Sequence, residues 1–513
     1  MRTPRRVDLA TALSGLLAAV SIAYILAFVL AGYFRITYAY PLAPMEAPVI
    51  QAVRRILQGQ PLYGPPGLDY VPTLYTPLYF YVSALAARLL GPSLMTLRLI
   101  SLIASLGSAA LIGHLVWRET RHATASVVAA GLFVCSTSLA ETILDLARVD
   151  ALGVFLILAG LDLARAADVR PPRQAVWLTL SSGVVVGLAI LTKQTALAVA
   201  GALTVQAVLS RSPLRLVAFV AGAGVAVGVA AATLVAQYGA WPELYLVELP
   251  RQHAFQLEHL EGFWSKQLLP GFTLPLVGLG VFVVGRLAQR DLAGLQFWML
   301  ATLGLLGMAW GASLNRWAGD NVLAPAFAIA SAGFGLGLAE GLRRLEAVSR
   351  PARMFRGYLL VLGVAEFAFV FYNPRYTSPL RSDVDAGQRM VAAIRALPGA
   401  VYGPEFPELV YQAGRGEQAF GLSVGELEGM FGGRPRPQGT LWTTAYAEAL
   451  DERRYDEVLL ESEAAELFLT DSTRDHGYVD TGPLIPAGDE FYRLDSRFMP
   501  RLHVWVPGER VGH

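Results

Sequence analysis

The sequence contains very little cysteine and few charged residues. Cys135 is the only cysteine in the 513-residue chain, so no disulfide can form within the chain, and a thiolate metal site is disfavoured. Charged residues make up 16% of the sequence, whereas a soluble domain carries about 25%. The formal net charge is +1, so no overall basic field indicates a nucleic-acid partner.

Apolar sequence is abundant instead. Hydrophobic residues make up 54% of the chain and the mean hydropathy is +0.46, which predicts an integral membrane protein. The first apolar run follows a basic N-terminus and is too long for a signal peptide, so it predicts an uncleaved anchor helix. A helix needs about 20 mostly apolar residues to cross a bilayer. Eleven runs approach or reach this length: 9–34, 97–117, 124–141, 151–164, 175–192, 195–210, 214–237, 269–285, 293–314, 321–340 and 357–372.

The positions of the arginines predict the topology. If residues 35–96 stay outside the membrane, every second connection carries at least two arginines, from "RTPRR" to "RRLEAVSRPARMFR", as the positive-inside rule requires. An extra span within "LYTPLYFYVSALAARLLG" would move the basic loops outside. We therefore expect a cytoplasmic N-terminus, and two interfacial helices in residues 35–96 with Arg54, Arg55 and Arg88 at the level of the lipid headgroups.

The composition changes near residue 373. Charges become frequent, and the short apolar runs "GAVYG", "YDEVLLES" and "RLHVWVP" alternate with helical patterns such as "TTAYAEALDERR". These patterns predict strands and helices of a small α/β domain. The predicted organisation is a transmembrane domain over residues 1–372 and an extracytoplasmic α/β domain over residues 373–513.

In this topology, polar residues collect at the outer ends of the spans. Ionisable groups near the apolar slab are costly and often mark a site, although for any one residue an interfacial anchor or an ion pair is an equal alternative. Lys193 lies in apolar sequence and needs an anionic partner, either a carboxylate or a phosphate. The expected group consists of Glu46, Glu141, Asp145, Arg148, Asp150, Lys193, Gln194, Arg251, His253, Arg316, Asp320 and Asn321.

Two acidic segments of this group suggest specific roles. Arg148 in "ETILDLARVD" could pair with Asp145 or Asp150, or could bind a substrate. Glu46 lies in "APMEAP", which supplies no local cation and whose prolines favour extended backbone. A carboxylate at the mouth of a membrane cavity can take a proton from an incoming nucleophile, so we predict that Glu46 is a general base. The alternative is an exposed glutamate with no chemical role.

Several motifs, taken in order, resemble a known family. The acid after the first span, "AVRRILQGQPLYGPP" and "VPTLYTPLYFYVSALAARLLG" resemble the first outer loop of polytopic glycosyltransferases of the GT-C class. The segments "LARVDALGVFLILAG" and "GLAILTKQTAL" are similar to later motifs of that class. The likeness is to bacterial glycosyltransferase family 39, which includes relatives of the protein O-mannosyltransferases and of the lipid A aminoarabinose transferase. It implies a polytopic α-helical GT-C fold with about 11 transmembrane helices.

The resemblance also implies roles for individual residues. Glu46 would deprotonate the acceptor, Arg148 and Lys193 would hold the phosphate of a polyprenyl-phosphate sugar, and Asp150 would orient the donor or an ion. Many relatives have an Asp-Glu pair in the first loop, but Met45 precedes Glu46 here, and a single carboxylate is a poor site for a divalent cation. A requirement for such a cation therefore stays open. The other expected substrate-binding residues are Tyr70, Tyr75, Gln194, Arg251, His253, Arg316, Asp320 and Asn321.

The predicted function is transfer of a sugar from a polyprenyl-phosphate donor to a lipid, glycan or protein acceptor, on the outer face of the bacterial inner membrane. One rival is a transporter or flippase for a lipid-linked saccharide, which would use the same cationic cavity. The absence of a recognisable internal repeat disfavours it. Another is a non-catalytic protein whose outer domain binds a cell-envelope partner. The sequence does not separate transfer of a single sugar from ligation of a whole glycan.

Overall fold

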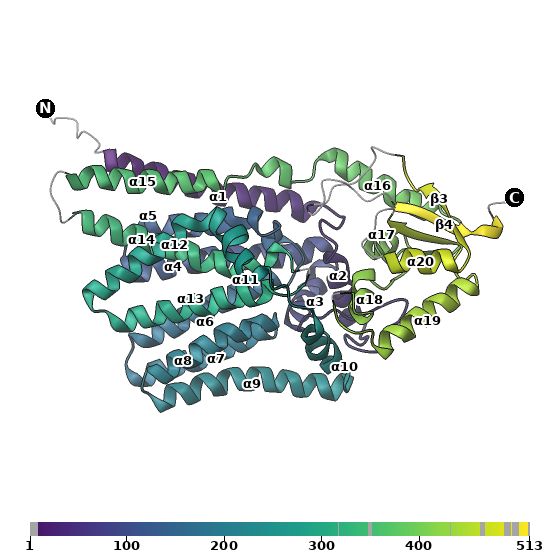
Figure 1. Cartoon of the computed structure of the whole chain (residues 1–513), viewed down its shortest axis with the longest axis horizontal. Helices are drawn as coiled ribbons and strands as arrows, with labels where there is room; N and C mark the ends of the chain where they lie inside the picture. Colours follow the sequence, from purple (N-terminus) through teal and green to yellow (C-terminus); the bar gives the residue numbers. More distant parts are fainter. Residues whose placement is uncertain are drawn as a thin grey trace.

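The computed structural model describes residues 9–316, 318–346, 351–430, 432–461, 467–486, 494 and 502–510. Long helices form a bundle, and the C-terminal part of the chain forms a small α/β region at one end of it (Figure 1). The bundle helices are α1 (Leu9–Thr37), α4 (Leu94–Thr120), α5 (Ala123–Cys135), α6 (Asp150–Asp168), α7 (Pro172–Ile190), α8 (Leu197–Leu209), α9 (Pro213–Tyr238), α12 (Leu269–Gln289), α13 (Leu292–Ser313), α14 (Ala324–Glu346) and α15 (Pro351–Phe369).

Each predicted apolar run coincides with one of these helices. Within the described residues, eight helical segments are long and apolar enough to cross a membrane, which confirms a multi-pass membrane protein. The other three runs form α5, α6 and α8. Helices α5 and α8 have 13 residues each, or about 20 Å of helix, which is less than a hydrocarbon core of about 30 Å. A total of eleven crossings therefore stays a prediction.

Local signals and small residues explain how the helices begin and pack. The Ser93 and Asp291 side chains accept backbone N–H groups at the starts of α4 and α13, as N-caps do. On α7 and α9, Gly183 and Gly222 lie so close to the facing backbone that a Cβ at either position would overlap it. Small residues of this kind let membrane helices approach closely.

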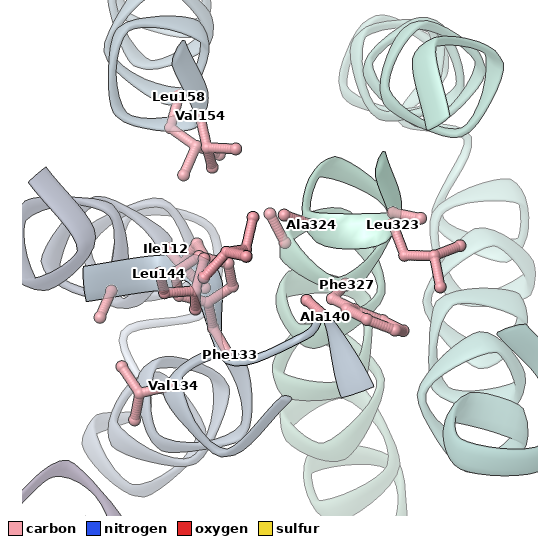
Figure 2. Close-up of a cluster of buried hydrophobic side chains, with 14 of the residues drawn as sticks. Ile112, Phe133, Val134, Ala140, Leu144, Val154, Leu158, Leu323, Ala324 and Phe327 are labelled. Atoms are coloured by element: carbon pink, nitrogen blue, oxygen red, sulfur yellow. The ribbon is translucent and has the colours of Figure 1, made fainter. Parts of the chain in front are cut away.

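The bundle core lies next to the connection between α5 and α6. Figure 2 shows Ile112 of α4 and Phe133 of α5 in one buried cluster with Leu144 of this connection and Phe327 of α14. All four side chains are almost completely buried. The connection therefore has a fixed place against α4, α5 and α14, and this fixes the residues that it presents at the outer end of the bundle.

Two short helices lie between α1 and α4, and their presence agrees with the prediction for residues 35–96. They are α2 (Glu46–Leu57) and α3 (Leu78–Leu90). The predicted exposure of Arg54 is wrong. Its guanidinium is buried, with Nη2 2.7 Å from Glu408 Oε2 and Nε 2.5 Å from Glu417 Oε1. Both carboxylates come from the C-terminal region, so α2 is covered by that region and does not present Arg54 to lipid headgroups.

The C-terminal region contains a four-stranded mixed sheet. Its strands are β1 (Val401–Tyr402), β2 (Glu457–Glu461), β3 (Tyr478–Pro483) and β4 (Leu502–Pro507), in the order β1-β2-β4-β3. Strands β1 and β2 are parallel, and the other pairs are antiparallel. The α/β prediction and three of its strands are confirmed, but β3 was not predicted. The helices of this region are α16 (Arg381–Ala396), α17 (Pro407–Gln412), α18 (Gly421–Leu427), α19 (Pro437–Asp451) and α20 (Leu467–Asp475).

The predicted orientation can be tested with two exposed positions. Leu441 on α19 and Gln174 at the start of α7 are both exposed, and the native Cys135 is buried. In intact spheroplasts, a membrane-impermeant maleimide should label Leu441→Cys but should label Gln174→Cys only after permeabilisation. The reverse pattern would contradict an extracytoplasmic C-terminal region.

Candidate active site

Glu46 lies inside the protein and not at the mouth of a cavity, so that part of the prediction is wrong. Its carboxylate is fully buried and accepts hydrogen bonds from Arg98 Nε at 2.8 Å and Arg98 Nη2 at 2.6 Å. The backbone N–H groups of Leu42 and Ala147 donate to the same carboxylate, at 2.7 and 2.8 Å. Burial by itself raises the pKa of Glu46, but these four donors reverse the effect and lower it.

Arg98 fixes the backbone around this ion pair. It comes from α4, 52 residues after Glu46 in the sequence. Its two Nη atoms also donate to the carbonyl oxygens of Arg35, Tyr38 and Tyr40, at 2.5 to 2.7 Å. The pair therefore ties the connection between α1 and α2 to α4. The Glu46 oxygens already accept four hydrogen bonds and do not line the pocket described below, so the geometry of Glu46 indicates a structural role.

A second buried ion pair decides between the two acidic partners predicted for Arg148, of which only Asp150 lies near it, at 3.3 Å from Arg148 Nε. Asp145 Oδ2 lies 2.6 Å from Arg35 Nε in the last turn of α1, and both side chains are fully buried. Arg148 does not pair with Asp145. This pair anchors the connection between α5 and α6 to α1, just as Ala147 anchors it to Glu46.

A pocket of about 470 Å³ lies among the loops that were predicted to be extracytoplasmic. Two of these loops form its wall together: Gln256 N donates to Leu314 O at 2.8 Å, and Arg316 N donates to Ala254 O at 2.8 Å. The predicted site residues that line the pocket are Tyr75, Arg148, Lys193, Gln194, His253, Arg316 and Asn321, and Met45 and Glu141 line it with them. The structure thus brings these residues from separate loops together around one pocket.

Asp150 contacts three of the pocket residues without lining the pocket itself. It is almost completely buried at the first residue of α6. Its carboxylate lies 2.6 Å from Lys193 Nζ and 3.3 Å from Arg148 Nε, and it accepts a hydrogen bond from Asn321 Nδ2 at 3.1 Å. The predicted need of Lys193 for an anionic partner is thus met by a carboxylate. Asp150 positions the cations but does not itself line this pocket.

Three predicted binding residues lie outside the pocket lining. Tyr70 is buried, and its hydroxyl donates to Leu62 O at 3.0 Å. Its ring is therefore not available to stack on a sugar in the pocket. Arg251 is exposed. The Asp320 side chain accepts from Gln267 Nε2 at 2.9 Å, while its backbone N–H donates to Glu141 Oε1 at 2.8 Å. Asp320 therefore contributes to the site through its backbone.

The C-terminal region adds residues that the sequence did not suggest. Leu422, Ser423 and Glu426 of α18 line the pocket. Glu426 Oε2 lies 2.6 Å from His253 Nε2, across 173 residues of sequence. Burial raises the pKa of Glu426, and His253 opposes the rise. No local sequence pattern predicts a contact between residues so far apart in the chain. The only available signal was the apolar residues of α18, which indicate that this segment packs against other parts of the protein.

The described residues contain no group of three or more His, Cys, Asp or Glu side chains that could hold a metal ion. The carboxylate that lies closest behind the pocket, Asp150, already faces Lys193 and Arg148. The residues present thus offer cations where a bound anion would need them, and no ready set of oxygen ligands for a divalent cation.

The helical bundle, the two short helices α2 and α3 and the pocket agree with the predicted GT-C class of membrane proteins. Residues 72–236 match the family described as dolichyl-phosphate-mannose-protein mannosyltransferase. The fold is similar to that of ArnT from Cupriavidus metallidurans in the apo state, with a TM-score of 0.61 and 12% identity over 95% of this chain and 98% of the other. The same protein bound to undecaprenyl phosphate gives a TM-score of 0.59 and 12% identity, over 94% and 97%.

No curated protein sequence matches the chain significantly. The family match confirms the resemblance to the protein O-mannosyltransferases and the predicted enzyme class, a membrane glycosyltransferase. The structural likeness confirms the fold.

Removing one partner of the Glu46–Arg98 pair should lower stability strongly. A buried charge left without its partner typically costs about 3–5 kcal/mol. Glu46→Gln and Arg98→Met should therefore each lower the apparent melting temperature of the detergent-solubilised protein, and the double variant should be more stable than the sum of the two losses predicts. Asp471→Asn, which breaks an exposed pair with Arg474, should change little. A Glu46→Gln variant as stable as the wild type would contradict the structural role.

Proposed function

We propose that the protein transfers a sugar from a polyprenyl-phosphate donor to an acceptor at the outer end of the bundle. The observation that carries this proposal is the meeting of Arg148, Lys193 and Arg316 in one pocket. Arg148 and Lys193 are held by Asp150. Among the described residues, no carboxylate pairs with the Arg316 side chain. An anionic group in the pocket would supply the missing partner.

The charge change during the reaction suits this pocket. A sugar phosphodiester carries one negative charge, and the polyprenyl phosphate that leaves carries more. Cations that are already in place stabilise the departing phosphate more strongly than they stabilise the bound donor, and this lowers the barrier. Arginine and lysine bind phosphate well, so Arg148, Lys193 and Arg316 can perform this role without a metal ion.

A lipid-linked donor also agrees with the location of the pocket. It lies at the ends of membrane helices, where a lipid headgroup can enter while its prenyl chain stays in the bilayer. The fold resembles that of ArnT, which has been seen bound to undecaprenyl phosphate, and this likeness supports the same class of donor. We place the site on the extracytoplasmic face of the bacterial inner membrane because of the arginine distribution.

The acceptor side of the pocket would be formed by the C-terminal region. Leu422, Ser423 and Glu426 reach the pocket from α18. A lipid, glycan or protein acceptor approaching from outside would meet this helix.

The proposal predicts turnover by the purified full-length protein in lipid nanodiscs. Radiolabelled undecaprenyl-phosphate sugars are supplied one at a time, with an envelope lipid and glycan extract as acceptor. We expect transfer of label from at least one donor, with release of undecaprenyl phosphate. Movement of intact donor across proteoliposomes without transfer would favour a flippase, and neither activity with any donor would favour a binding protein.

Loss of the Arg316 charge should weaken donor use specifically. Arg316→Gln removes a cation that no described carboxylate pairs with, so it leaves no carboxylate orphaned. We expect KM for the donor to rise about tenfold or more, which corresponds to the loss of one charge-assisted phosphate contact. Arg88→Gln, which removes an exposed cation of α3, is the matched control and should leave KM unchanged. Equal kinetics for Arg316→Gln and wild type would argue against a phosphate subsite there.

A further inference from the structure

The proposed transfer needs a group that removes a proton from the acceptor hydroxyl. Glu46 is enclosed by four hydrogen-bond donors, and its neighbour Met45, which faces the pocket, cannot act as a base. The base must therefore come from another loop. The following inference rests on the proposed function and asks which residue completes it.

Among the described residues, two carboxylates line the pocket, Glu141 and Glu426. Glu426 belongs to α18, and its Oε2 lies 2.6 Å from His253 Nε2. One of its two carboxylate oxygens is therefore already engaged. Glu141 comes from the connection between α5 and α6, the same segment that carries Arg148. Its side chain is 40% exposed, whereas Glu46, Asp145 and Asp150 are buried against cations. Glu141 is therefore the acid most accessible to an entering molecule.

The backbone at Glu141 adopts an unusual conformation. Glu141 has φ +54° and Thr142 has φ +57°, so two consecutive non-glycine residues adopt the left-handed region, which is sterically unfavourable for both. Such conformations persist where the surrounding structure enforces them, and they concentrate at functional sites. Here the neighbouring residues are anchored by the Arg35–Asp145 pair and by the bond from Ala147 to Glu46.

The environment of Glu141 fixes one oxygen and leaves the other open. Asp320 N donates to Oε1 at 2.8 Å, and Gly319 lies so close that a Cβ there would overlap this carboxylate. Oε2 lies 3.8 Å from Arg148 Nη1, which is beyond hydrogen-bonding distance. The carboxylate is thus oriented through Oε1, while Oε2 keeps its capacity to accept a proton next to a cation of the proposed phosphate subsite.

We propose that Glu141 is the catalytic base of the transfer. Its Oε2 accepts the proton of the acceptor hydroxyl while that oxygen forms a bond to the anomeric carbon of the donor sugar. The bond between this carbon and the phosphate oxygen breaks at the same time. The electron pair leaves with the polyprenyl phosphate, which Arg148, Lys193 and Arg316 stabilise.

The charges around Glu141 set the expected pH dependence. Burial raises its pKa, Arg148 and the Asp320 N–H lower it, and the charges of Asp320 and Asp150 raise it, with a net rise above the ordinary value for glutamate. A base works only when deprotonated, so kcat should fall as the pH falls through this pKa. The acid limb of the wild-type profile should therefore lie above the pKa of an ordinary glutamate.

The test compares variants of the full-length protein in nanodiscs, with whichever undecaprenyl-phosphate sugar the wild type turns over. Binding is measured separately with tritiated undecaprenyl phosphate. We expect Glu141→Gln to lower kcat about 10²- to 10⁴-fold, the usual contribution of a general base, while binding is retained. Glu141→Asp should keep part of the rate, and Gly319→Ala should lower kcat by displacing the carboxylate. Glu258→Gln, an exposed acid of a neighbouring loop outside the pocket lining, is the control.

The outcomes separate this inference from the proposed function. Wild-type turnover that survives in Glu141→Gln, or an acid limb that is the same in wild type and Glu141→Asp, overturns the role of Glu141 alone. A wild type that turns over none of the donors overturns the proposed function, and with it this inference. Loss of undecaprenyl phosphate binding in Glu141→Gln also overturns the role of a base, because the residue would then act in the donor site.

Discussion

The buried ion pair between Glu46 and Arg98 determines how the end of the bundle that carries the pocket is built. One carboxylate accepts two guanidinium N–H groups and two backbone N–H groups from separate segments. The same guanidinium donates to three carbonyl groups in the last turn of α1 and in the residues that follow it. Because an unpaired buried charge is costly, these segments have little freedom to move apart. The pair thus fixes α1, α2, α4 and the connection to α6 before any substrate binds.

The remaining acids divide according to whether a cation compensates them. Asp145 is paired with Arg35 and Asp150 with Lys193 and Arg148, so both are structural supports of the pocket. Glu141 lines the pocket, and its Oε2 lies 3.8 Å from Arg148 Nη1, which is beyond hydrogen-bonding distance. Preorganised cations and one open carboxylate are the groups that a displacement at an anomeric carbon requires. In our proposal, the acids that are paired with cations hold the site, whereas the open carboxylate of Glu141 and the cations that line the pocket perform the chemistry.

Much of the fold follows from the sequence because it depends on local patterns. Each predicted apolar run is a helix, and the C-terminal change in composition marks the sheet region. The site was harder to predict because its contacts are long-range. "APMEAP" gives no sign of Arg98, and nothing in "VRRIL" indicates that Glu408 and Glu417 cover Arg54. Hydropathy cannot tell which of Met45 and Glu46 faces the pocket, since that depends on how α2 begins against α4.

We propose above all that the pocket binds the phosphate of a polyprenyl lipid beside Glu141. A cryo-electron microscopy structure of the full-length protein in nanodiscs containing undecaprenyl phosphate tests it most directly. We predict that the phosphate contacts Arg316 and Lys193, with the Glu141 carboxylate facing the adjoining space and Glu46 still enclosed by Arg98. A phosphate bound elsewhere, or an outer pocket closed in the presence of the lipid, would contradict the account.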